Sequence, residues 1–142
     1  MTLHSWTVVI PGAPVAWGRA GIDFARRRVF TAARSAAWKA LAVSEVSSDS
    51  KRPRRLCCPV SVGIVAVFER PARLKTKARA ETHAWHVAKP DADNLMKACC
   101  DALQNAGVVA DDCVAYDVRV VKRYALGDEQ PHVFIRVTWE GE

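Results

Sequence analysis

The stretch that decides the fold is Lys89-Pro90-Asp91-Ala92-Asp93-Asn94-Leu95-Met96-Lys97, which opens a helix. Pro90 disfavours a helical conformation at Lys89, so the helix begins after it, with Asp91 as a plausible N-cap. Apolar residues then recur at helical spacing as far as Ala106, and Gly107 stands where a C-terminal glycine cap belongs. The sequence therefore predicts a helix over residues 92–105.

The start of this helix carries more negative charge than a cap requires. Asp91 at the cap and Asp93 in the first turn can both face the helix N-terminus, where they repel unless a cation or a proton lies between them. The helix dipole eases this repulsion by only about 0.3–1 kcal/mol. Mg²⁺ would ease it far more, since it takes one or two carboxylates and leaves its other positions for water and phosphate oxygens.

Asp112 is the third candidate carboxylate. To join Asp91 and Asp93, the chain after the helix must run back along the whole helix length. A helix over residues 92–105 is about 21 Å long at 1.5 Å per residue. Residues 106–112 reach about 23 Å at roughly 3.3 Å each, which is just enough for a chain that doubles straight back. A cluster of three carboxylates within one chain is therefore sterically possible.

Each of these residues also has an ordinary structural role. Asp91 can be a plain N-cap, Asp93 and Lys97 a surface pair four residues apart, and Asp112 a turn residue. Asp101 lies about 12 Å along the helix axis from Asp93, so we expect it to be structural. The joint occurrence of these residues, rather than any single one, favours a catalytic site.

The helix and its flanks resemble the RusA family of Holliday-junction resolvases. The shared pattern is D-x-D-N-L-x-K, then D-A-L, then a late D-D, present here at Asp91–Lys97, Asp101–Leu103 and Asp111-Asp112. The resemblance runs from about His86 to Lys122, and His86 matches a histidine found in part of the family. Elsewhere in the chain only the order of elements agrees.

The resemblance implies a site and an activity. Asp91, Asp93 and Asp112 would bind Mg²⁺, with Mn²⁺ as an expected substitute, and Lys97 would act as an essential base near the scissile phosphate. The protein would be a homodimer that nicks a four-way DNA junction symmetrically on two strands, in recombination and repair. The alternatives are a non-catalytic, basic DNA-binding dimer and a nuclease for other branched DNA.

Composition sets the broad class. The 142 residues suffice for one domain with a real core, and we expect a single domain over residues 1–142. No apolar run is long enough to span a membrane, and the first residues lack the regions of a signal peptide. The five cysteines include no C-x-x-C spacing, so we expect reduced thiols in a cytoplasmic protein rather than a zinc site.

The net charge of +6 hides an asymmetry. Residues 1–89 hold 16 Lys and Arg against 5 Asp and Glu, whereas residues 90–142 hold 5 against 10. An acidic site set into a basic protein suits a metal-dependent enzyme that acts on a polyanion. A solvated basic surface is the ordinary alternative.

Basic loops supply candidate contacts to DNA phosphates. Residues 15–30 are expected to form an irregular loop without the spacing of a P-loop, so no nucleotide cofactor is expected. In the second loop, residues 70–88, Trp85 is expected to anchor the loop, with stacking on an unpaired base as the alternative. Residues 51–55 fit two interpretations equally well, a phosphate-contacting arm and a solvated loop. The candidate DNA-binding side chains are Arg19, Arg26, Arg27, Arg28, Arg73, Lys75, Lys77 and Lys89.

Two further elements follow from hydrophobic periodicity near the N-terminus. Residues 6–10 form a strand that Pro11 stops, and Thr31 caps a helix that runs to about Val46. Trp38 is expected in the core rather than stacked on a base. The helix is expected to pack on the sheet through small side chains, namely Ala33, Ala36, Ala37, Ala40, Leu41 and Val43.

The remaining strands complete the sheet. Residues 60–69 are apolar on both faces and indicate an interior strand. Residues 114–124 alternate, with Tyr116 on the apolar side, and residues 133–139 alternate again, so the two are expected to pair as an antiparallel hairpin. The fold class is α+β with order β-α-β-α-β-β: two layers, in which a mostly antiparallel or mixed sheet of about four strands packs with two main helices.

Overall fold

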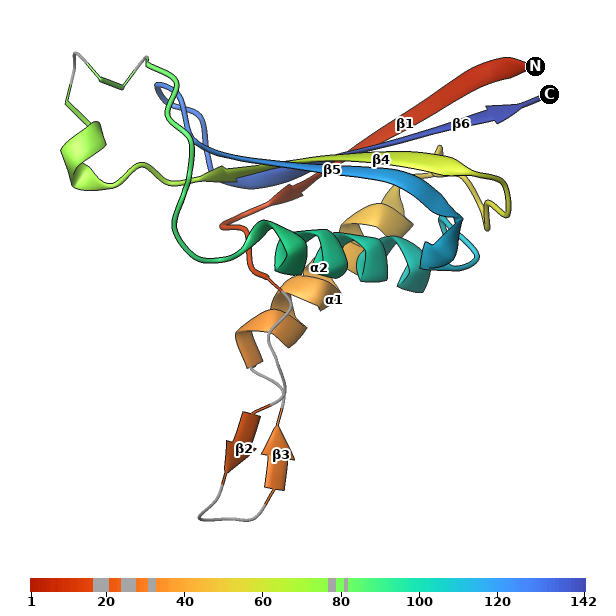
Figure 1. Cartoon of the computed structure of the whole chain (residues 1–142), viewed down its shortest axis with the longest axis horizontal. Coiled ribbons are helices and arrows are strands. Elements are labelled where there is room, and N and C mark those ends of the chain that lie inside the picture. Colours follow the sequence, from red (N-terminus) through yellow and green to blue (C-terminus); the bar gives the residue numbers. More distant parts are fainter. Residues whose placement is uncertain (17–20, 24–27, 31–32, 77–78, 81) are drawn as a thin grey trace.

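A mixed sheet of four strands carries helices α1 (Ala33–Ser48) and α2 (Ala92–Asn105) on one face (Figure 1). The computed structural model describes all residues except 17–20, 24–27, 31–32, 77–78 and 81, and no side chains between residues 17 and 32. The strands of the sheet lie in the order β1 (Thr2–Pro11), β6 (His132–Gly141), β4 (Val60–Phe68), β5 (Ala115–Tyr124). This confirms the expected α+β architecture.

Strand β4 is the interior strand that its sequence predicted. It pairs with β6 in antiparallel and with β5 in parallel orientation. Val60, Val62 and Ile64 are at most 2% exposed and face the helices. They form the core together with buried side chains of β1 and β6, namely Trp6, Val8, Ile10, Val133, Ile135 and Val137.

The predicted hairpin between the last two strands is wrong, because β4 lies between β5 and β6. The chain leaves β5 at Tyr124, passes the end of β4 and returns as β6 (Figure 1). Alternation identifies a half-buried strand but not its partner. The apolar strand β4 takes a middle position, where both of its edges are paired and the face toward the helices is buried, whereas most residues of its other face are only partly buried.

Tyr116 also differs from expectation. The register between β4 and β5 shifts after Val60, which pairs with Ala115, whereas Ser61 pairs with Asp117. Tyr116 is the extra residue of this β-bulge and is 73% exposed. A bulge interrupts the alternation by one residue, so the apolar side expected for Tyr116 is wrong.

Helix α1 turns a different face to the core from the predicted alanine face. Its buried residues are Ser35, Trp38, Ala42 and Val46, and Trp38 is 5% exposed, as expected of a core residue. One indole buries about 150–250 Å², far more than any single alanine methyl group, so the rotation that buries Trp38 is favoured. Of the predicted face only Val43 packs against the core, and the exposed residues are Ala33, Ala36, Ala37, Ala40 and Leu41. Thr31, the predicted cap, lies outside the described residues.

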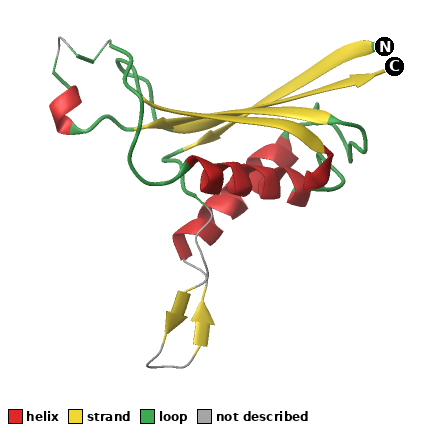
Figure 2. Cartoon of the chain, viewed as in Figure 1, coloured by secondary structure: helices red, strands yellow, loops and turns green. Residues whose placement is uncertain are grey.

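The segment expected as an irregular loop forms a small hairpin instead. Strand β2 (Gly21–Asp23) pairs in antiparallel orientation with β3 (Arg28–Phe30), and the pair projects away from the sheet (Figure 2). Two short 3-10 turns, η1 (Ala72–Leu74) and η2 (Asp112–Val114), lie in the connections. Among the described residues, no helix is long and apolar enough to cross a membrane.

Candidate active site

The N-terminal end of α2 begins as its sequence predicts. Asp91 is the N-cap, with φ −69° and ψ 149°, and its carbonyl accepts the first helical hydrogen bond from Leu95 at 3.2 Å. Its carboxylate does not cap the helix. Instead, both of its oxygens accept from the Lys89 ammonium, at 2.9 and 3.0 Å. This ion pair is largely exposed, so it adds little stability and can exchange partners.

Packing of α2 turns the candidate residues outward. Its buried side chains are Leu95, Ala98, Cys99, Ala102 and Leu103, and they leave Asp93 and Lys97 on the exposed face. The glycine cap predicted at Gly107 is confirmed, and its hydrogen bonds are those of a Schellman motif. Gly107 has φ +76°, and the amide of Val108 donates to the carbonyl of Leu103 at 2.9 Å. The length and rotation of α2 are therefore fixed by its packing and its caps.

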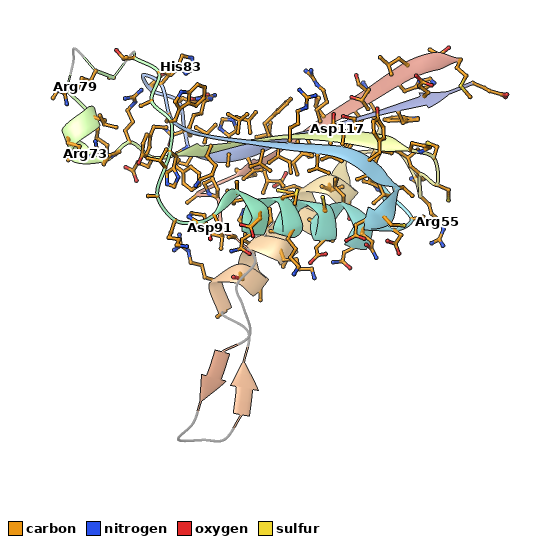
Figure 3. The ribbon with its side chains drawn as sticks, in the orientation of Figure 1. Arg55, Arg73, Arg79, His83, Asp91 and Asp117 are labelled. Carbon is orange, nitrogen blue, oxygen red and sulfur yellow. The ribbon has the colours of Figure 1, made fainter. Side chains whose placement is uncertain are left out.

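Asp112 lies at the other end of the same helix. Its amide donates to Oε1 of Gln104, in the last turn of α2, at 3.1 Å. The chain reaches this point through Val108 and Val109, which are buried. Figure 3 shows Asp91 at the opposite end of α2. The early and late acidic pairs are thus held at the two ends of a helix about 21 Å long.

The late pair concentrates negative charge. The amide of Cys113 donates to Asp111 at 3.0 Å, and this hydrogen bond holds the pKa of Asp111 below its usual value. A hydrogen bond with Asp111 raises the pKa of Asp112, and burial and the charges of Asp111 and Asp101 raise it further. Burial, followed by the charges of Asp112 and Asp101, raises the pKa of Cys100 to about 11. Asp101, expected to be only structural, therefore acts on Asp112. The sequence showed that Asp101 lies far from Asp93 along the helix, but it did not show that Asp101 lies close to Asp112. The influence of Asp101 on Asp112 was therefore not predicted.

Three of the four candidate catalytic residues meet at one pocket of about 420 Å³. Its lining residues are Asp93, Met96, Lys97, Cys100, Asp112, Ala115 and Val118. Asp93 and Cys100 are seven residues apart, about 10 Å along the helix axis, so the pocket follows α2. Asp91 does not line it. Within the described ranges, no three His, Cys, Asp or Glu side chains are grouped closely enough to hold a metal ion.

The candidate DNA-binding residues differ in whether the structure describes them and in whether they form ion pairs. Arg73 is exposed, whereas Lys75 forms an ion pair with Glu69 at 2.9 Å and Lys89 pairs with Asp91. Arg28 belongs to β3, but its side chain is outside the described part of the structure. The candidates that lie wholly outside the described residues are Arg19, Arg26, Arg27 and Lys77.

The basic loop over residues 70–88 is anchored by Arg70 and His86, neither of which was expected to anchor it. Arg70 is 5% exposed, and its guanidinium donates to the carbonyls of Leu74, Thr82 and Ala125. The ring of His86 is 8% exposed and stacks on Phe68 with centroids 3.6 Å apart. Burial, followed by the charge of Lys122, lowers the pKa of His86, so the ring is packed in its neutral form.

Trp85 does not anchor the loop, and that expectation is wrong. Its side chain is 62% exposed, and its nearest ring neighbour is His83, with centroids 5.9 Å apart. The backbone is extended here and forms a bridge with Arg123 of β5. Successive side chains of an extended chain point in opposite directions, so His86 turns inward while Trp85 and Val87 turn outward.

Comparisons with known proteins identify the family of the chain. No curated protein sequence matches the chain at a significant level. Among protein families, the one described as endodeoxyribonuclease RusA matches residues 11–138, nearly the whole chain. The matched region includes α2, both acidic pairs and the pocket between them. The chain therefore belongs to the RusA family of endodeoxyribonucleases.

Proposed function

We propose that this protein is a Mg²⁺-dependent endodeoxyribonuclease that resolves four-way DNA junctions by paired, symmetric nicks during recombination and repair. The observation that carries the proposal is the pocket shared by Asp93, Lys97 and Asp112. RusA membership supports a nuclease of the Holliday-junction-resolving kind. We also propose a cytoplasmic location, which the five free cysteines support because thiols stay reduced there.

The chemistry of the pocket fits a hard divalent cation. Mg²⁺ prefers carboxylate oxygens, and the carboxylates around Asp112 already raise its pKa, so added positive charge would relieve their repulsion. Asp91, Asp93 and Asp112 would hold Mg²⁺, or Mn²⁺ in its place. When bound, the ion would supply an activated water and would neutralise charge on the phosphate. The side chains as placed would have to come closer together, and Asp91 would have to release Lys89.

A homodimer would provide two things that the proposed reaction needs: a matching site for each of two DNA strands, and further charged groups close to each pocket. Two protomers related by a two-fold axis would present matching sites to two DNA strands, as symmetric nicking needs. The partner could also bring a carboxylate or its lysine to the first protomer's pocket. We therefore propose that Lys97 serves either the pocket of its own chain or that of the partner.

Lys97 would bind the scissile phosphate. Its ammonium lies on the exposed face of α2 and lines the pocket, where it can donate to a phosphate oxygen and position the phosphorus for attack. Arg73 and Lys89 would contact neighbouring phosphates. The exposed indole of Trp85 offers a surface on which a base could stack.

The decisive experiment compares Asp93→Asn with Asp117→Asn on a synthetic four-way junction in Mg²⁺. Asp93→Asn keeps the side-chain volume on an exposed helical face, so the fold and junction binding should persist while paired nicking falls about 100-fold or more. Asp117 lies on β5, pairs with Arg119 at 3.4 Å and is outside the pocket, so its variant should nick normally.

Wild-type nicking rates in Asp93→Asn would contradict the proposal. If the wild-type protein binds junctions with strong salt dependence but never nicks them in Mg²⁺ or Mn²⁺, the protein is a non-catalytic DNA-binding dimer. If it nicks flaps but leaves four-way junctions intact, the nuclease assignment holds and the substrate is a different branched DNA.

A further inference from the structure

Arg55 has an unusual backbone conformation. Among the described residues it is the one non-glycine residue with a positive φ, at 52°. Glycine adopts this left-handed conformation without penalty, whereas a residue with a Cβ pays a steric cost, and a long side chain is uncommon there. An arginine kept in a conformation that favours glycine points to a use for its side chain.

The position of Arg55 is fixed against the segment that leads from α2 to the late acidic pair. Its amide donates to the carbonyl of Gly107 at 2.7 Å, and the amide of Leu56 donates to the carbonyl of Val108 at 2.8 Å. The amide of Ala110 donates in return to the carbonyl of Leu56 at 2.9 Å. Asp111 follows directly. The loop at Arg55 is therefore held beside the C-terminal end of α2 rather than tethered loosely.

The guanidinium groups of this loop are exposed to solvent. Arg54 and Arg55 are exposed, and within the described part of the chain neither guanidinium forms a hydrogen bond or an ion pair. Arg52 differs, because its Nη1 donates to the carbonyls of Ser47 and Asp49, at 2.8 and 3.2 Å, and so serves the end of α1. Figure 3 shows Arg55 beside the end of α2 that lies opposite Asp91.

We infer that Arg54 and Arg55 form a binding site for DNA phosphates at the C-terminal end of α2. Lys89 marks the other end of the helix, about 21 Å away. A DNA strand that touched both ends would pass along the pocket and cover about six nucleotides, at about 3.4 Å each. Guanidinium groups bind phosphates without reading sequence, so the site would position DNA rather than select bases. The inference rests on the proposed function in taking DNA as the substrate.

Arg55→Gly is the informative variant, because it removes the charge while accepting the positive φ. Its melting temperature should stay close to that of the wild-type protein, since relief of steric strain offsets the extra freedom of glycine in the unfolded chain. Arg55→Gln removes the charge but keeps a side chain of similar length in the same backbone conformation. Arg119→Gln is the matched control, because Arg119 is an exposed arginine of β5 that lies outside the pocket and the Arg54–Arg55 loop.

Binding of a fluorescent four-way junction is measured by anisotropy, with Ca²⁺ replacing Mg²⁺, at several salt concentrations. Each Arg55 variant should bind about fivefold to tenfold more weakly near 0.1 M salt, and the slope of log K against log salt should become shallower by about 0.9, the value for one lost phosphate contact. Arg119→Gln should match the wild-type protein.

Unchanged affinity and slope in both Arg55 variants would overturn the inference, as would an equal loss in Arg119→Gln. The outcome is independent of cleavage. If the wild-type protein never nicks DNA but the Arg55 variants still bind more weakly, the proposed function fails and the phosphate site stands. If nicking is normal and Arg55 variants bind normally, only the phosphate site fails.

Discussion

The ion pair between Arg123 and Glu129 makes the turn after β5 sensitive to acid. Two nitrogens of Arg123 donate to the two carboxylate oxygens of Glu129, at 2.6 and 2.9 Å, and the amide of Leu126 adds a third donor. This turn includes Ala125, whose carbonyl accepts from the buried guanidinium of Arg70. Replacing Glu129 with glutamine therefore tests a contact that also supports the basic loop leading to α2 and the candidate active site.

The magnitude follows from the carboxyl group. Arg123 holds the pKa of Glu129 at about 2, against an ordinary value of 4.5. At about 1.36 kcal/mol for each unit of pKa, this difference corresponds to at most about 3.4 kcal/mol. The two side chains are 18% and 29% exposed, so water screens part of the interaction. We expect Glu129→Gln to lower the free energy of unfolding by about 1.5–2.5 kcal/mol at pH 7.

The pH dependence has a definite sign. The pKa of Glu129 is depressed in the folded state, so its contribution is fully present well above pH 4.5 and is lost as the pH falls toward 2. More than half of it should be gone at about pH 3. The difference in stability between wild type and Glu129→Gln should therefore shrink in acid.

The assay is urea denaturation of both proteins at pH 7 and pH 3, with Glu69→Gln as the matched control. Glu69 also pairs with a cation, Lys75 at 2.9 Å, but these side chains are 72% and 53% exposed. An exposed pair contributes about 0–1 kcal/mol, so this variant should change little. Equal losses in the two variants, or a Glu129→Gln loss that stays constant between pH 7 and pH 3, would refute the reasoning.

Four further substitutions test the packing around the candidate site by thermal or chemical denaturation. Leu95→Ala should cost about 2–5 kcal/mol, because Leu95 is 1% exposed under the start of α2, and a cost below about 1 kcal/mol would contradict its core position. Gly107→Ala should cost about 1–2 kcal/mol because of its positive φ, so an unchanged stability would mean that the cap conformation differs. Trp85→Ala should leave stability within about 0.5 kcal/mol, since the indole is 62% exposed, whereas Phe68→Ala removes the ring beneath His86 and should destabilise clearly. Equal losses in these last two variants would restore Trp85 as an anchor.

The sequence predicted those elements whose signals are local. The start of α2 at Asp91 and its end at Gly107 follow from a proline, a cap and a glycine, all within a few residues of the boundary they set. The interior position of β4 follows from its own composition, since both of its faces are apolar. These predictions needed no knowledge of what lies on the other side of the core.

The structure differs from the sequence-based predictions where the position of a side chain or strand depends on elements that are distant in the sequence. Apolar side chains occur all round α1, and the inward face is the one that buries Trp38 rather than the one with the most alanines. The bulge at Tyr116 exists only because β5 pairs with β4, and the pairing of β6 with β4 instead of β5 is set by the whole sheet. The outward position of Trp85 likewise depends on Phe68, which holds the neighbouring His86 inward.

The candidate site likewise has one part that could be predicted from local sequence and one part that could not. The outward orientation of Asp93 and Lys97 could be predicted, because it follows from the helical spacing of α2. The position of Asp112 could not, because chain length sets only the farthest point that residues 106–112 can reach. Those residues do not run straight back along the helix: buried Val108 and Val109 pack under its end and hold Asp112 near Gln104. The packing of these two valines therefore sets the position of Asp112.

Helix α2 consequently acts as a rigid spacer between the two acidic pairs. Its five buried side chains and its Schellman motif would all be disturbed if the helix shortened or rotated to bring the pairs together. Side chains alone move by a few ångströms, less than the helix length of about 21 Å that separates its two ends. If Asp91, Asp93 and Asp112 act on one phosphate, as we propose, Asp93 and Asp112 do so across the pocket that both of them line, and Asp91 has to release Lys89 to join them. A two-fold partner, or a DNA strand that lies along α2 and meets both acidic pairs in turn, would bring the remaining groups together.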